Sequence, residues 1–385
     1  MKCDMKDVAI LTKYYKNYNY GGMLQGYALH RVITELGYSC DIVSYNVNEN
    51  KNPVYKNVAQ QCKQYGMTSA AKKVLEKVIS KFNFIIKDVL ISRQVLFDKF
   101  MEMNAAGTEV FTDENLTTLN NEYKMFVSGS DQVWNPNAVR KLYLQGFVSD
   151  NRKKIAYAAS IGRDKFSKYE ADILIPYIKR FDYLGIREKT GKELLEEYMD
   201  RNIDTVLDPT LLLGQDEWSI VATERLINEP YALVYFFSDS FKVRKKLEKF
   251  CEQRGLKLVL IPYAKQEFNL GDHKGKCIRL DDVGPREFVS AIKYADYVFT
   301  DSFHGAVFSI IHGKQFFVFE RNKKGHVSMN SRLYDLLDTF HLRNRLLVMD
   351  STIETTDDID YKRVDNILTK EKEKSTNFLK KALEG

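Results

Sequence analysis

Residues 8–45, VAILTKYYKNYNYGGMLQGYALHRVITELGYSCDIVSY, decide the fold of this chain. The apolar run at 8–12 predicts a buried strand, and the apolar stripe that follows the glycine pair predicts a helix ending at Gly37. A second apolar run, 41–45, comes directly afterwards. Strand, helix and strand in this order predict a βαβ unit with parallel strands and a right-handed crossover.

Short apolar runs of the same kind continue along the chain. In the first half, runs typical of buried parallel strands lie at 125–129, 155–160, 183–187 and 205–207. The pattern begins again after Pro230, with runs at 231–237, 256–262, 297–300 and 315–319. We therefore expect an α/β fold of two Rossmann-like domains that face a central cleft. Ligands of such folds bind at the carboxyl ends of the strands, so the residues that follow the strands are the functional candidates.

The chain divides into two domains and a tail. We expect an N-terminal Rossmann-like domain over residues 1–225, a C-terminal one over 226–345, and a helical tail over 346–385 that packs back across the domains. An insert at about 51–105 interrupts the first domain; its first fifty residues, 51–100, contain ten Lys and Arg but three Asp and Glu, together with an apolar stripe. This pattern predicts a basic amphipathic helix, whose apolar face either covers the core or contacts anionic lipid.

Composition excludes several classes of protein. The 385 residues are 44% hydrophobic with a net charge of +6, which is typical of a globular chain of two domains. No recognition motif accompanies the basic residues, so we expect no nucleic-acid partner. The five cysteines are scattered without a CxxC pair, which argues against disulfides and metal sites. The first apolar run is too short for a signal peptide or a spanning helix, so we expect a cytoplasmic protein, either free or peripheral at the inner face of the cell membrane.

The segment YVFTDSFHGAVFSIIHG, at 297–313, is the most informative one for chemistry. An apolar strand ends there and a helix begins, with Asp301 or Ser302 as its N-cap. His304 then lies in the first helical turn, where unpaired backbone N–H groups bind anions. A histidine in this place either exchanges a proton with a bound substrate or is a structural residue.

Two further strand ends carry polar or glycine residues. After the first strand, Asn19, Gly21 and Gly22 form a loop in which the backbone can approach a ligand or simply make a turn. After the strand at 125–129, Ser130 and Asp131 follow at once. Asp131 could orient a sugar hydroxyl, act as a base, or cap the next helix.

Arginines supply the candidate cations. Arg187 follows the strand at 183–187, where it could hold a carboxylate or phosphate through its guanidinium, or form an ion pair with Glu188. Arg332 is a weaker candidate for the same role. The sequence contains no GxSxG, P-loop or metal-ligand spacing, which removes the usual support for a serine hydrolase, a P-loop kinase or a metalloenzyme.

Six segments, taken in order, resemble the polysaccharide pyruvyl transferase family, particularly forms found in bacterial capsule and exopolysaccharide gene clusters. They are NYGGMLQGYAL, VSGSDQVWN, AYAASIG, GIREKTG, VLDPTLLL and TDSFHGAVFSIIHGKQFFVF, within residues 8–340. The resemblance implies a fold like the GT-B glycosyltransferases, with phosphoenolpyruvate as donor substrate and no further cofactor. It also implies a saccharide acceptor, either free or lipid-linked, that receives pyruvate as a ketal.

The resemblance also implies roles for individual residues. The family's histidine matches His304 and its strand-end arginine matches Arg187, whereas the arginine that many members carry two residues before the histidine is Ser302 here. We expect the N-terminal domain to hold the acceptor and the C-terminal domain the donor. The expected donor-binding residues are Arg187, Ser302, His304, Gly305 and Arg332. The expected acceptor-binding residues are Asn19, Gly21, Gly22, Ser130 and Asp131, with His304 as acid and Asp131 as base.

Two rival functions fit the same fold. A GT-B glycosyltransferase would share the architecture and use a nucleotide sugar, so it would respond to a nucleoside diphosphate instead of phosphoenolpyruvate. A glycan-binding protein without turnover is the second rival, which the serine at position 302 makes conceivable.

Overall fold

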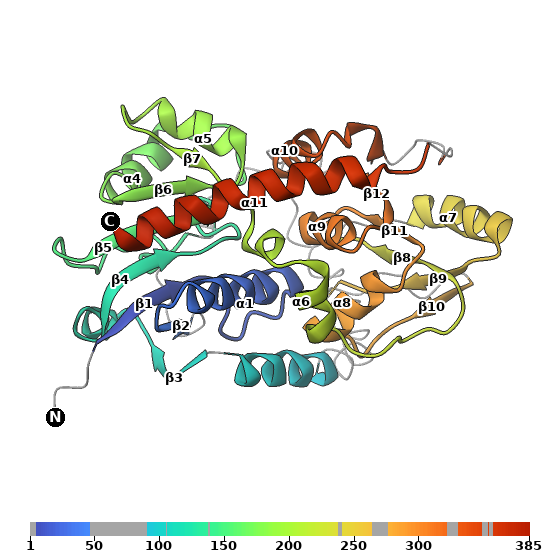
Figure 1. The fold of residues 1–385 in the computed structure, drawn as a ribbon, viewed down its shortest axis with the longest axis horizontal. Helices are drawn as coiled ribbons and strands as arrows, with labels where there is room; N and C mark the ends of the chain where they lie inside the picture. The colour runs from blue at the N-terminus through green and yellow to red at the C-terminus, as the bar shows by residue number, and fades with distance from the viewer. Residues whose placement is uncertain are drawn as a thin grey trace, which may run out of the picture.

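The protein folds around two parallel sheets placed end to end (Figure 1). The computed structural model describes residues 5–46, 91–104, 106–137, 139–237, 241–263, 276–321, 330–348, 353 and 357–385. The prediction of two Rossmann-like α/β domains that face one another is confirmed by these sheets. The residue bounds given above for the domains remain predictions.

The first sheet has seven strands in the order β3-β2-β1-β4-β5-β6-β7, all of them parallel. Its strands are β1 (Lys6–Leu11), β2 (Cys40–Tyr45), β3 (Ala106–Phe111), β4 (Tyr123–Ser128), β5 (Lys153–Ala159), β6 (Tyr183–Ile186) and β7 (Asp204–Thr205). The parallel pairing of β1 with β2 confirms the predicted βαβ unit at the start of the chain.

The second sheet has six strands in the order β10-β9-β8-β11-β12-β13, again parallel. Its strands are β8 (Tyr231–Tyr235), β9 (Lys257–Leu260), β10 (Cys277–Arg279), β11 (Tyr297–Thr300), β12 (Gln315–Phe319) and β13 (Leu346–Leu347). Every predicted apolar run overlaps a strand, whereas the strands β3, β10 and β13 were not predicted.

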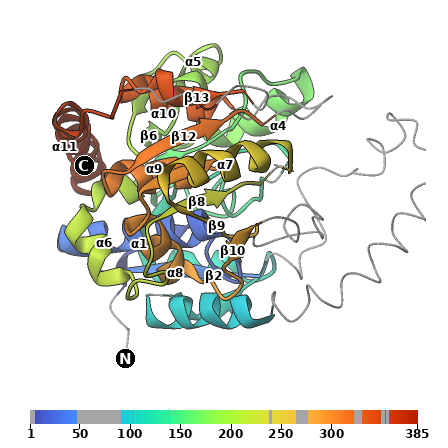
Figure 2. The ribbon, with the colours of Figure 1, turned by 90° about the vertical axis from the view of Figure 1, so that its right-hand side faces the viewer.

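Helices cover the faces of both sheets (Figure 2). Besides a helix over residues 91–103, the α-helices in the described part of the chain are α1 (Tyr20–Glu35), α4 (Lys168–Ile178), α5 (Lys189–Glu196), α6 (Gln215–Val221), α7 (Phe241–Arg254), α8 (Pro285–Lys293), α9 (Phe303–Ile311), α10 (Ser331–Thr339) and α11 (Tyr361–Glu384). Short 3-10 helices are η1 (Leu116–Asn121), η2 (Pro209–Leu212) and η4 (Arg343–Arg345). No helix in the described part of the chain is long and apolar enough to cross a bilayer.

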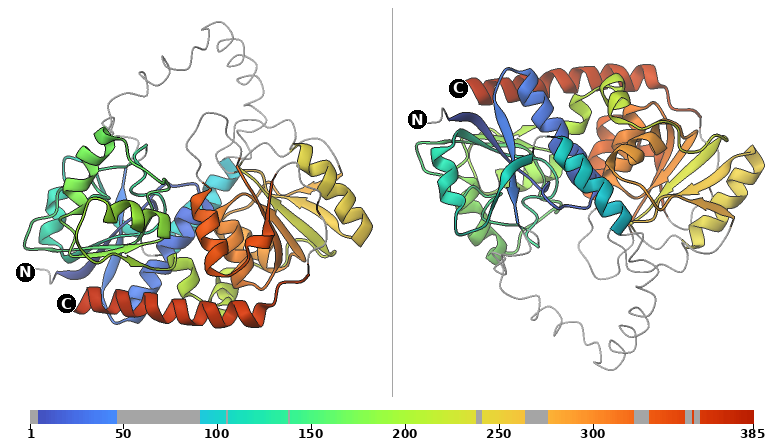
Figure 3. Two further views of the ribbon diagram at one scale, coloured as in Figure 1. Left: turned by 90° about the horizontal axis from the view of Figure 1, so that it is seen from above. Right: turned by 90° about the horizontal axis from the view of Figure 1, so that it is seen from below.

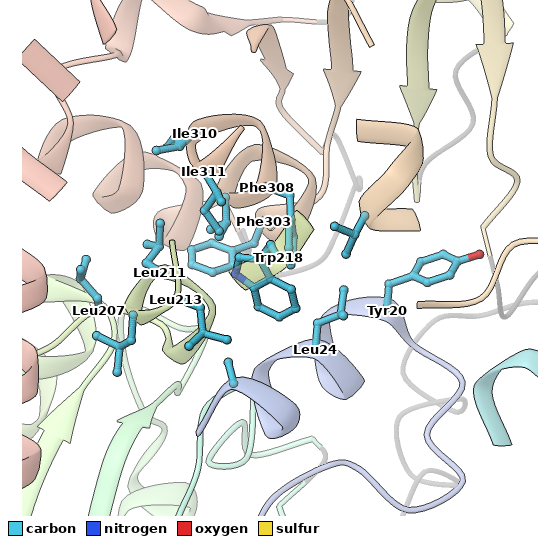
Figure 4. Packing of buried hydrophobic residues seen from close by; sticks show 14 of the residues in the cluster. Tyr20, Leu24, Leu207, Leu211, Leu213, Trp218, Phe303, Phe308, Ile310 and Ile311 are labelled. Atoms are coloured by element: carbon cyan, nitrogen blue, oxygen red, sulfur yellow. The ribbon is translucent and has the colours of Figure 1, made fainter. Parts of the chain in front are cut away.

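Side chains from both domains share one hydrophobic core. Tyr20 of α1 stacks on Phe288 of α8 with ring centroids 4.5 Å apart, and Trp218 of α6 meets Phe308 of α9 edge to face at 4.8 Å. Figure 4 shows Trp218 between Phe308 of α9 and Leu24 of α1. Because aromatic packing of this kind adds to the burial of apolar surface, the two domains are held as one body.

Two helices connect the domains on different faces of the molecule. The tail helix α11 runs across both domains, as Figure 3 shows from above and below. Tyr361 at its beginning donates to the carbonyls of Ser309 and Lys314, and near its end the carbonyl of Leu383 accepts from Lys153 Nζ at 3.0 Å. Residues 361–384 of the predicted tail thus form one helix across both domains, whereas β13 lies inside the predicted bounds of 346–385, which stay a prediction.

The second connection is a helix over residues 91–103. Its Arg93 is buried and donates to the carbonyls of Leu280, Asp281 and Pro262 of the C-terminal domain, while Phe97 packs on Tyr20 of α1. These residues end the predicted insert, so this part of it does pack on the core. The apolar stripe of the predicted amphipathic helix, at 74–89, lies outside the described residues.

Candidate active site

Asp208 lies at the centre of the site, between β7 and η2. It is the N-cap of η2, and its Oδ1 accepts hydrogen bonds from N and Oγ1 of Thr210 at 3.0 and 2.6 Å. Its Oδ2 accepts from Ser130 Oγ at 2.8 Å and Arg187 Nη1 at 2.9 Å, and lies 3.6 Å from His304 Nε2. Burial alone would raise the pKa of Asp208, but the nearby charges of His304 and Arg187 and the hydrogen bond from Thr210 hold this pKa well below its usual value. The ionised carboxylate therefore joins side chains from both domains.

His304 lies in the first turn of α9, at the carboxyl end of β11. Its ring is nearly buried and packs against the first turn of α1, where a Cβ built on Gly21 would lie 1.9 Å from Nδ1. Any residue other than glycine at position 21 would therefore displace the imidazole. The ring is held between α1 on its Nδ1 side and Asp208 on its Nε2 side.

Arg187 follows β6 and is buried with its guanidinium 4.2 Å from the centre of the Phe303 ring. Burial would lower its pKa, but the carboxylates of Asp208, Glu188 and Asp131 outweigh that effect and raise the pKa. Only Nη1 is hydrogen-bonded, to Ser130 Oγ and Asp208; within the described residues Nε and Nη2 donate no hydrogen bond. Nε instead lies 3.6 Å from Glu188 Oε2, so Nη2 is the guanidinium nitrogen without a partner among the described residues.

Glu188, the next residue, is also buried. Its Oε1 accepts three hydrogen bonds, from Ser160 Oγ at 2.8 Å, Ile161 N at 2.8 Å and Gly162 N at 3.0 Å. Its Oε2 is 3.6 Å from Arg187 Nε and accepts no hydrogen bond from the residues that the structure describes. The predicted ion pair of Arg187 with Glu188 is present, but the stronger partner of Arg187 is Asp208.

Arg332 of α10 is a buried cation on the other side of the cleft. When the Gln132 amide is oriented with its oxygen toward the guanidinium, that oxygen accepts from Nη2 at 2.7 Å and Nη1 at 3.0 Å. No carboxylate forms an ion pair with Arg332 among the described residues, and its Nε has no partner there. Burial and the charges of Arg187 and Arg321 lower the pKa of Arg332 to about 9.

Asp131 follows β4 with a φ of 70°, in the left-handed region, and turns rather than a helix follow it. The alternative that Asp131 caps the next helix is therefore wrong. Burial would raise its pKa, but Lys13, Arg187, His304 and Arg332 together lower the pKa to about 2. Asp131 is thus an ionised group near the same cations as Asp208.

The remaining candidates form contacts within the protein. Ser302 is the N-cap of α9, and its Oγ accepts from Gly305 N at 3.3 Å. Asn19 is the N-cap of α1, and its side chain accepts from Gly22 N at 3.1 Å. The structure therefore brings His304, Arg187, Ser130 and Gly21 together around Asp208, whereas the Asn19 side chain is engaged in capping.

A cavity of about 420 Å³ lies beside this cluster, between α5 of the first domain and α10 of the second. Arg187, Glu188, Asp208 and Arg332 line it together with Phe303. Sequence reasoning placed Arg187 and Arg332 here but missed Asp208 and assigned no site role to Glu188. The signal for Asp208 was its place directly after the apolar run at 205–207.

Two facing parallel sheets with a cleft at their carboxyl ends define a two-domain α/β protein of GT-B-like architecture. The chain belongs to the polysaccharide pyruvyl transferase family, because the model of that family matches residues 19–323. The predicted family is thereby confirmed, and it is a family of transferases.

Solved structures with a similar chain trace are distant in sequence. The UDP-GlcNAc 2-epimerase from Methanocaldococcus jannaschii is 11% identical with a TM-score of 0.48, over 94% of this chain and 91% of that one. A putative UDP-N-acetylglucosamine 2-epimerase from Listeria monocytogenes is 10% identical with a TM-score of 0.48, over 95% of each chain. Acinetobacter baumannii MurG is 9% identical with a TM-score of 0.41, over 98% and 93%. No protein with a curated description matches the sequence.

Proposed function

We propose that the protein transfers pyruvate from phosphoenolpyruvate to a diol of a saccharide, forming a ketal and releasing phosphate. The observation that carries this proposal is the pair of buried guanidiniums, Arg187 and Arg332. Both line one cavity, both have unused N–H groups in the described part of the chain, and Arg332 has no carboxylate partner there. A buried cation without a counter-charge is costly, and a bound anion removes that cost. Phosphoenolpyruvate carries two such anionic groups.

The reaction begins with the addition of one sugar hydroxyl to C2 of phosphoenolpyruvate, while a proton is added to C3. We assign that proton to His304, which is held between α1 and Asp208 next to the cations. The hydroxyl proton is released to water as its oxygen bonds to C2, and His304 regains a proton from water, so this step consumes no net proton. The product of this step is a tetrahedral carbon that bears methyl, carboxylate, phosphate and sugar oxygen.

In the second step the C2–O bond to phosphate breaks and the second sugar hydroxyl adds to C2. Its proton is transferred to the departing phosphate or to a nearby base, so the sum is one diol and one phosphoenolpyruvate consumed, and one ketal and one phosphate formed. Arg187 and Arg332 stabilise the negative charge that develops on phosphate. With a pKa of about 2, Asp131 is a weak base, and we assign it the role of balancing these cations.

The first experiment measures melting temperature for the wild type, Arg332→Met and His304→Ala with phosphoenolpyruvate, pyruvate, phosphate and nucleoside diphosphates. We expect phosphoenolpyruvate to stabilise the wild type, by about 2.7 kcal/mol at one hundred times its Kd. Arg332→Met removes an unpaired buried charge, so without ligand it should melt at or above the wild-type temperature and yet lose the response to phosphoenolpyruvate.

A purely structural role for Arg332 predicts the opposite, namely a lower melting temperature and an unchanged ligand response. A shift with a nucleoside diphosphate and none with phosphoenolpyruvate would replace this proposal with a nucleotide-sugar glycosyltransferase. Ser302 and Gly305, which were also predicted to bind the donor, lie at the N-cap and in the first turn of α9, on either side of His304. The variant His304→Ala therefore also tests this end of the helix.

A further inference from the structure

A second cavity, of about 650 Å³, lies at the amino ends of β5 and β6 in the first sheet. It is lined by the turn that precedes β5, the turn between α4 and β6, Arg201, and Gly385 after the end of α11. Figure 1 shows that end of α11 near β5, and the carbonyl of Leu383 accepts from Lys153 Nζ there. The candidate active site lies at the carboxyl ends of the strands, and the seven residues of β5 separate the two edges by roughly 20 Å. The second cavity is therefore separate from the cleft.

Cations dominate the side chains that line this second cavity, which we call the basic cavity. Its basic residues are Arg152, Lys153, Lys179, Arg180 and Arg201, and its acidic ones are Asp150 and Asp182. Arg180 forms an ion pair with Asp150, with Nη2 and Oδ1 3.0 Å apart. In the part of the chain that the structure describes, the other four cations have no carboxylate partner. The basic cavity therefore has an excess of positive charge.

Backbone carbonyls hold the guanidiniums of this cavity in place. Arg201 donates from Nη1 and Nη2 to the carbonyls of Phe181 and Asp182. Arg180 donates from Nη2 to the carbonyl of Val148 at 2.7 Å. A carbonyl oxygen orients a cation without cancelling its charge, so the positive potential in the cavity is preserved.

A sixth cation, Lys154, is buried next to the basic cavity. Its side chain is 3% exposed, and its Nζ donates to the carbonyls of Ser149 and Arg152 at 2.8 and 3.0 Å. Its ion pair with the exposed Asp150 is long, at 4.0 Å. Burial lowers the pKa of Lys154, and the positive charge of Arg180 lowers the pKa further. An anion in the cavity would offset this repulsion between cations.

The lining of the basic cavity favours one kind of ligand. Its Lys and Arg side chains offer N–H donors, and of its two aromatic residues Phe181 is buried, whereas Tyr183 is half-buried. A ligand is therefore held through negatively charged oxygens rather than through apolar contact. A phosphate group matches such a lining, because its oxygens accept from several cations at once and a guanidinium binds two of them together. The volume lies within the range of roughly 300–1,000 Å³ for small-molecule sites, so the cavity has room for more than one phosphate.

We propose that the basic cavity binds a phosphate-bearing anion. The anion bridges Arg152 before β5, Lys179 at the end of α4 and Arg201, so its binding stabilises the folded protein. This site is independent of the proposed function, because none of the residues that line the basic cavity lines the cleft. A soluble diphosphate and the headgroup of an anionic lipid share this chemistry, and the test separates these two sources.

The first arm of the test measures the binding of inorganic pyrophosphate by titration calorimetry. All proteins in this arm carry Arg332→Met, which is expected to remove anion binding in the cleft. Arg152→Gln/Lys179→Gln removes two charges from the basic cavity, and we expect it to weaken pyrophosphate binding at least tenfold. The control is Lys165→Gln/Lys168→Gln, which gives the same net charge, since both lysines are exposed before or at the beginning of α4 and do not line the cavity. It should weaken binding less than twofold.

The second arm sediments the protein, without Arg332→Met, with vesicles of phosphatidylcholine that contain phosphatidic acid. Sedimentation that is lost in Arg152→Gln/Lys179→Gln and kept in the control assigns the phosphate to a lipid headgroup. Pyrophosphate binding without sedimentation assigns it to a soluble anion. The exposed Lys179→Glu, with Lys168→Glu as its control, replaces the double variants if Arg152→Gln does not fold.

The proposal is overturned if neither pyrophosphate nor the vesicles lose more binding with the cavity variant than with the control. Equal losses would mean that binding follows net charge alone. The phosphoenolpyruvate melting shift should persist in Arg152→Gln/Lys179→Gln, because its substitutions lie at the other edge of the sheet. Absence of that shift in the wild type contradicts the proposed function and leaves the result for the basic cavity unchanged.

Discussion

Asp208 connects two of the three residues to which the proposed chemistry assigns a direct role, Arg187 and His304. It accepts a hydrogen bond from Arg187 and lies 3.6 Å from His304 Nε2, so it orients both side chains. We expect Asp208→Asn to lower the free energy of unfolding by about 3 kcal/mol at pH 7, because it leaves the buried Arg187 with less counter-charge. Urea unfolding measures this difference.

The pH dependence of that difference has a definite sign. Since the folded-state pKa of Asp208 lies below the ordinary value of 3.8, its carboxylate stabilises the folded protein above that value, and the contribution is lost as the pH falls toward the folded pKa. The difference in the free energy of unfolding between the wild type and Asp208→Asn should be constant from pH 7 to about 5 and should become smaller below pH 4.

Ser130→Ala is the control, because it removes only one hydrogen-bond donor from the same carboxylate. It should lower the free energy of unfolding by about 1 kcal/mol. An Asp208→Asn effect no larger than that of Ser130→Ala would contradict the central role of Asp208.

Single residues were predictable where a strand end made them visible. His304 and Arg187 each follow a strong apolar run, and parallel strands bring their carboxyl ends to one edge, so their approach across the cleft could be anticipated. Asp208 follows β7, a strand of two residues, and its role depends on contacts with β4, β6 and α9 that no local pattern encodes. Likewise, the burial of Arg332 arises from the packing of α10 against the other domain.

The first turn of α1 is shaped to receive the His304 ring. Ala in place of Gly normally stabilises a helix interior, by roughly 0.5–1 kcal/mol. At Gly21, however, the new Cβ would lie 1.9 Å from Nδ1, so the imidazole must move. We expect Gly21→Ala to retain the fold and to weaken phosphoenolpyruvate binding about tenfold, or about 1.4 kcal/mol, as measured by ligand-dependent melting.

The control for this variant is Gly107→Ala in β3. A Cβ at Gly107 would meet nothing closer than the Ile42 carbonyl oxygen at 3.7 Å, which is an ordinary contact. Gly107→Ala should leave phosphoenolpyruvate binding unchanged. Equal binding by Gly21→Ala and the wild type would show that the position of the His304 ring does not matter to the donor.

Elements were predictable according to their place in the sheets. Central strands such as β4 and β11 are buried on both faces and therefore appear as continuous apolar runs. The missed strands β3, β10 and β13 are the edges of their sheets, and the residues of β10 and β13 are only partly buried. Half-exposed edge strands carry a weak apolar signal, so their pairing depends on the neighbouring strand more than on their own sequence.

At the scale of the whole molecule, the cleft depends on connections that hold the domains together. The helix α11 lies across both, with Tyr361 bonded to the C-terminal domain and Ser375 Oγ accepting from Leu207 N at 2.9 Å in the loop that precedes Asp208. The helix over 91–103 makes a second connection on another face. Because the cavity has one wall from each domain, these connections also determine whether its two walls meet.

Leu379 tests that dependence, since it is fully buried where α11 packs on the first domain, among side chains of the shared core. We expect Leu379→Ala to lower the free energy of unfolding by about 3 kcal/mol through lost burial and the space it leaves. In calorimetry the whole transition should move to lower temperature as one peak, because α11 contacts both sheets. The neighbouring Lys380 is exposed, so Lys380→Ala should change stability by no more than about 0.5 kcal/mol. If instead only part of the Leu379→Ala transition shifts and the rest stays at the wild-type temperature, the domains unfold independently and α11 does not couple them.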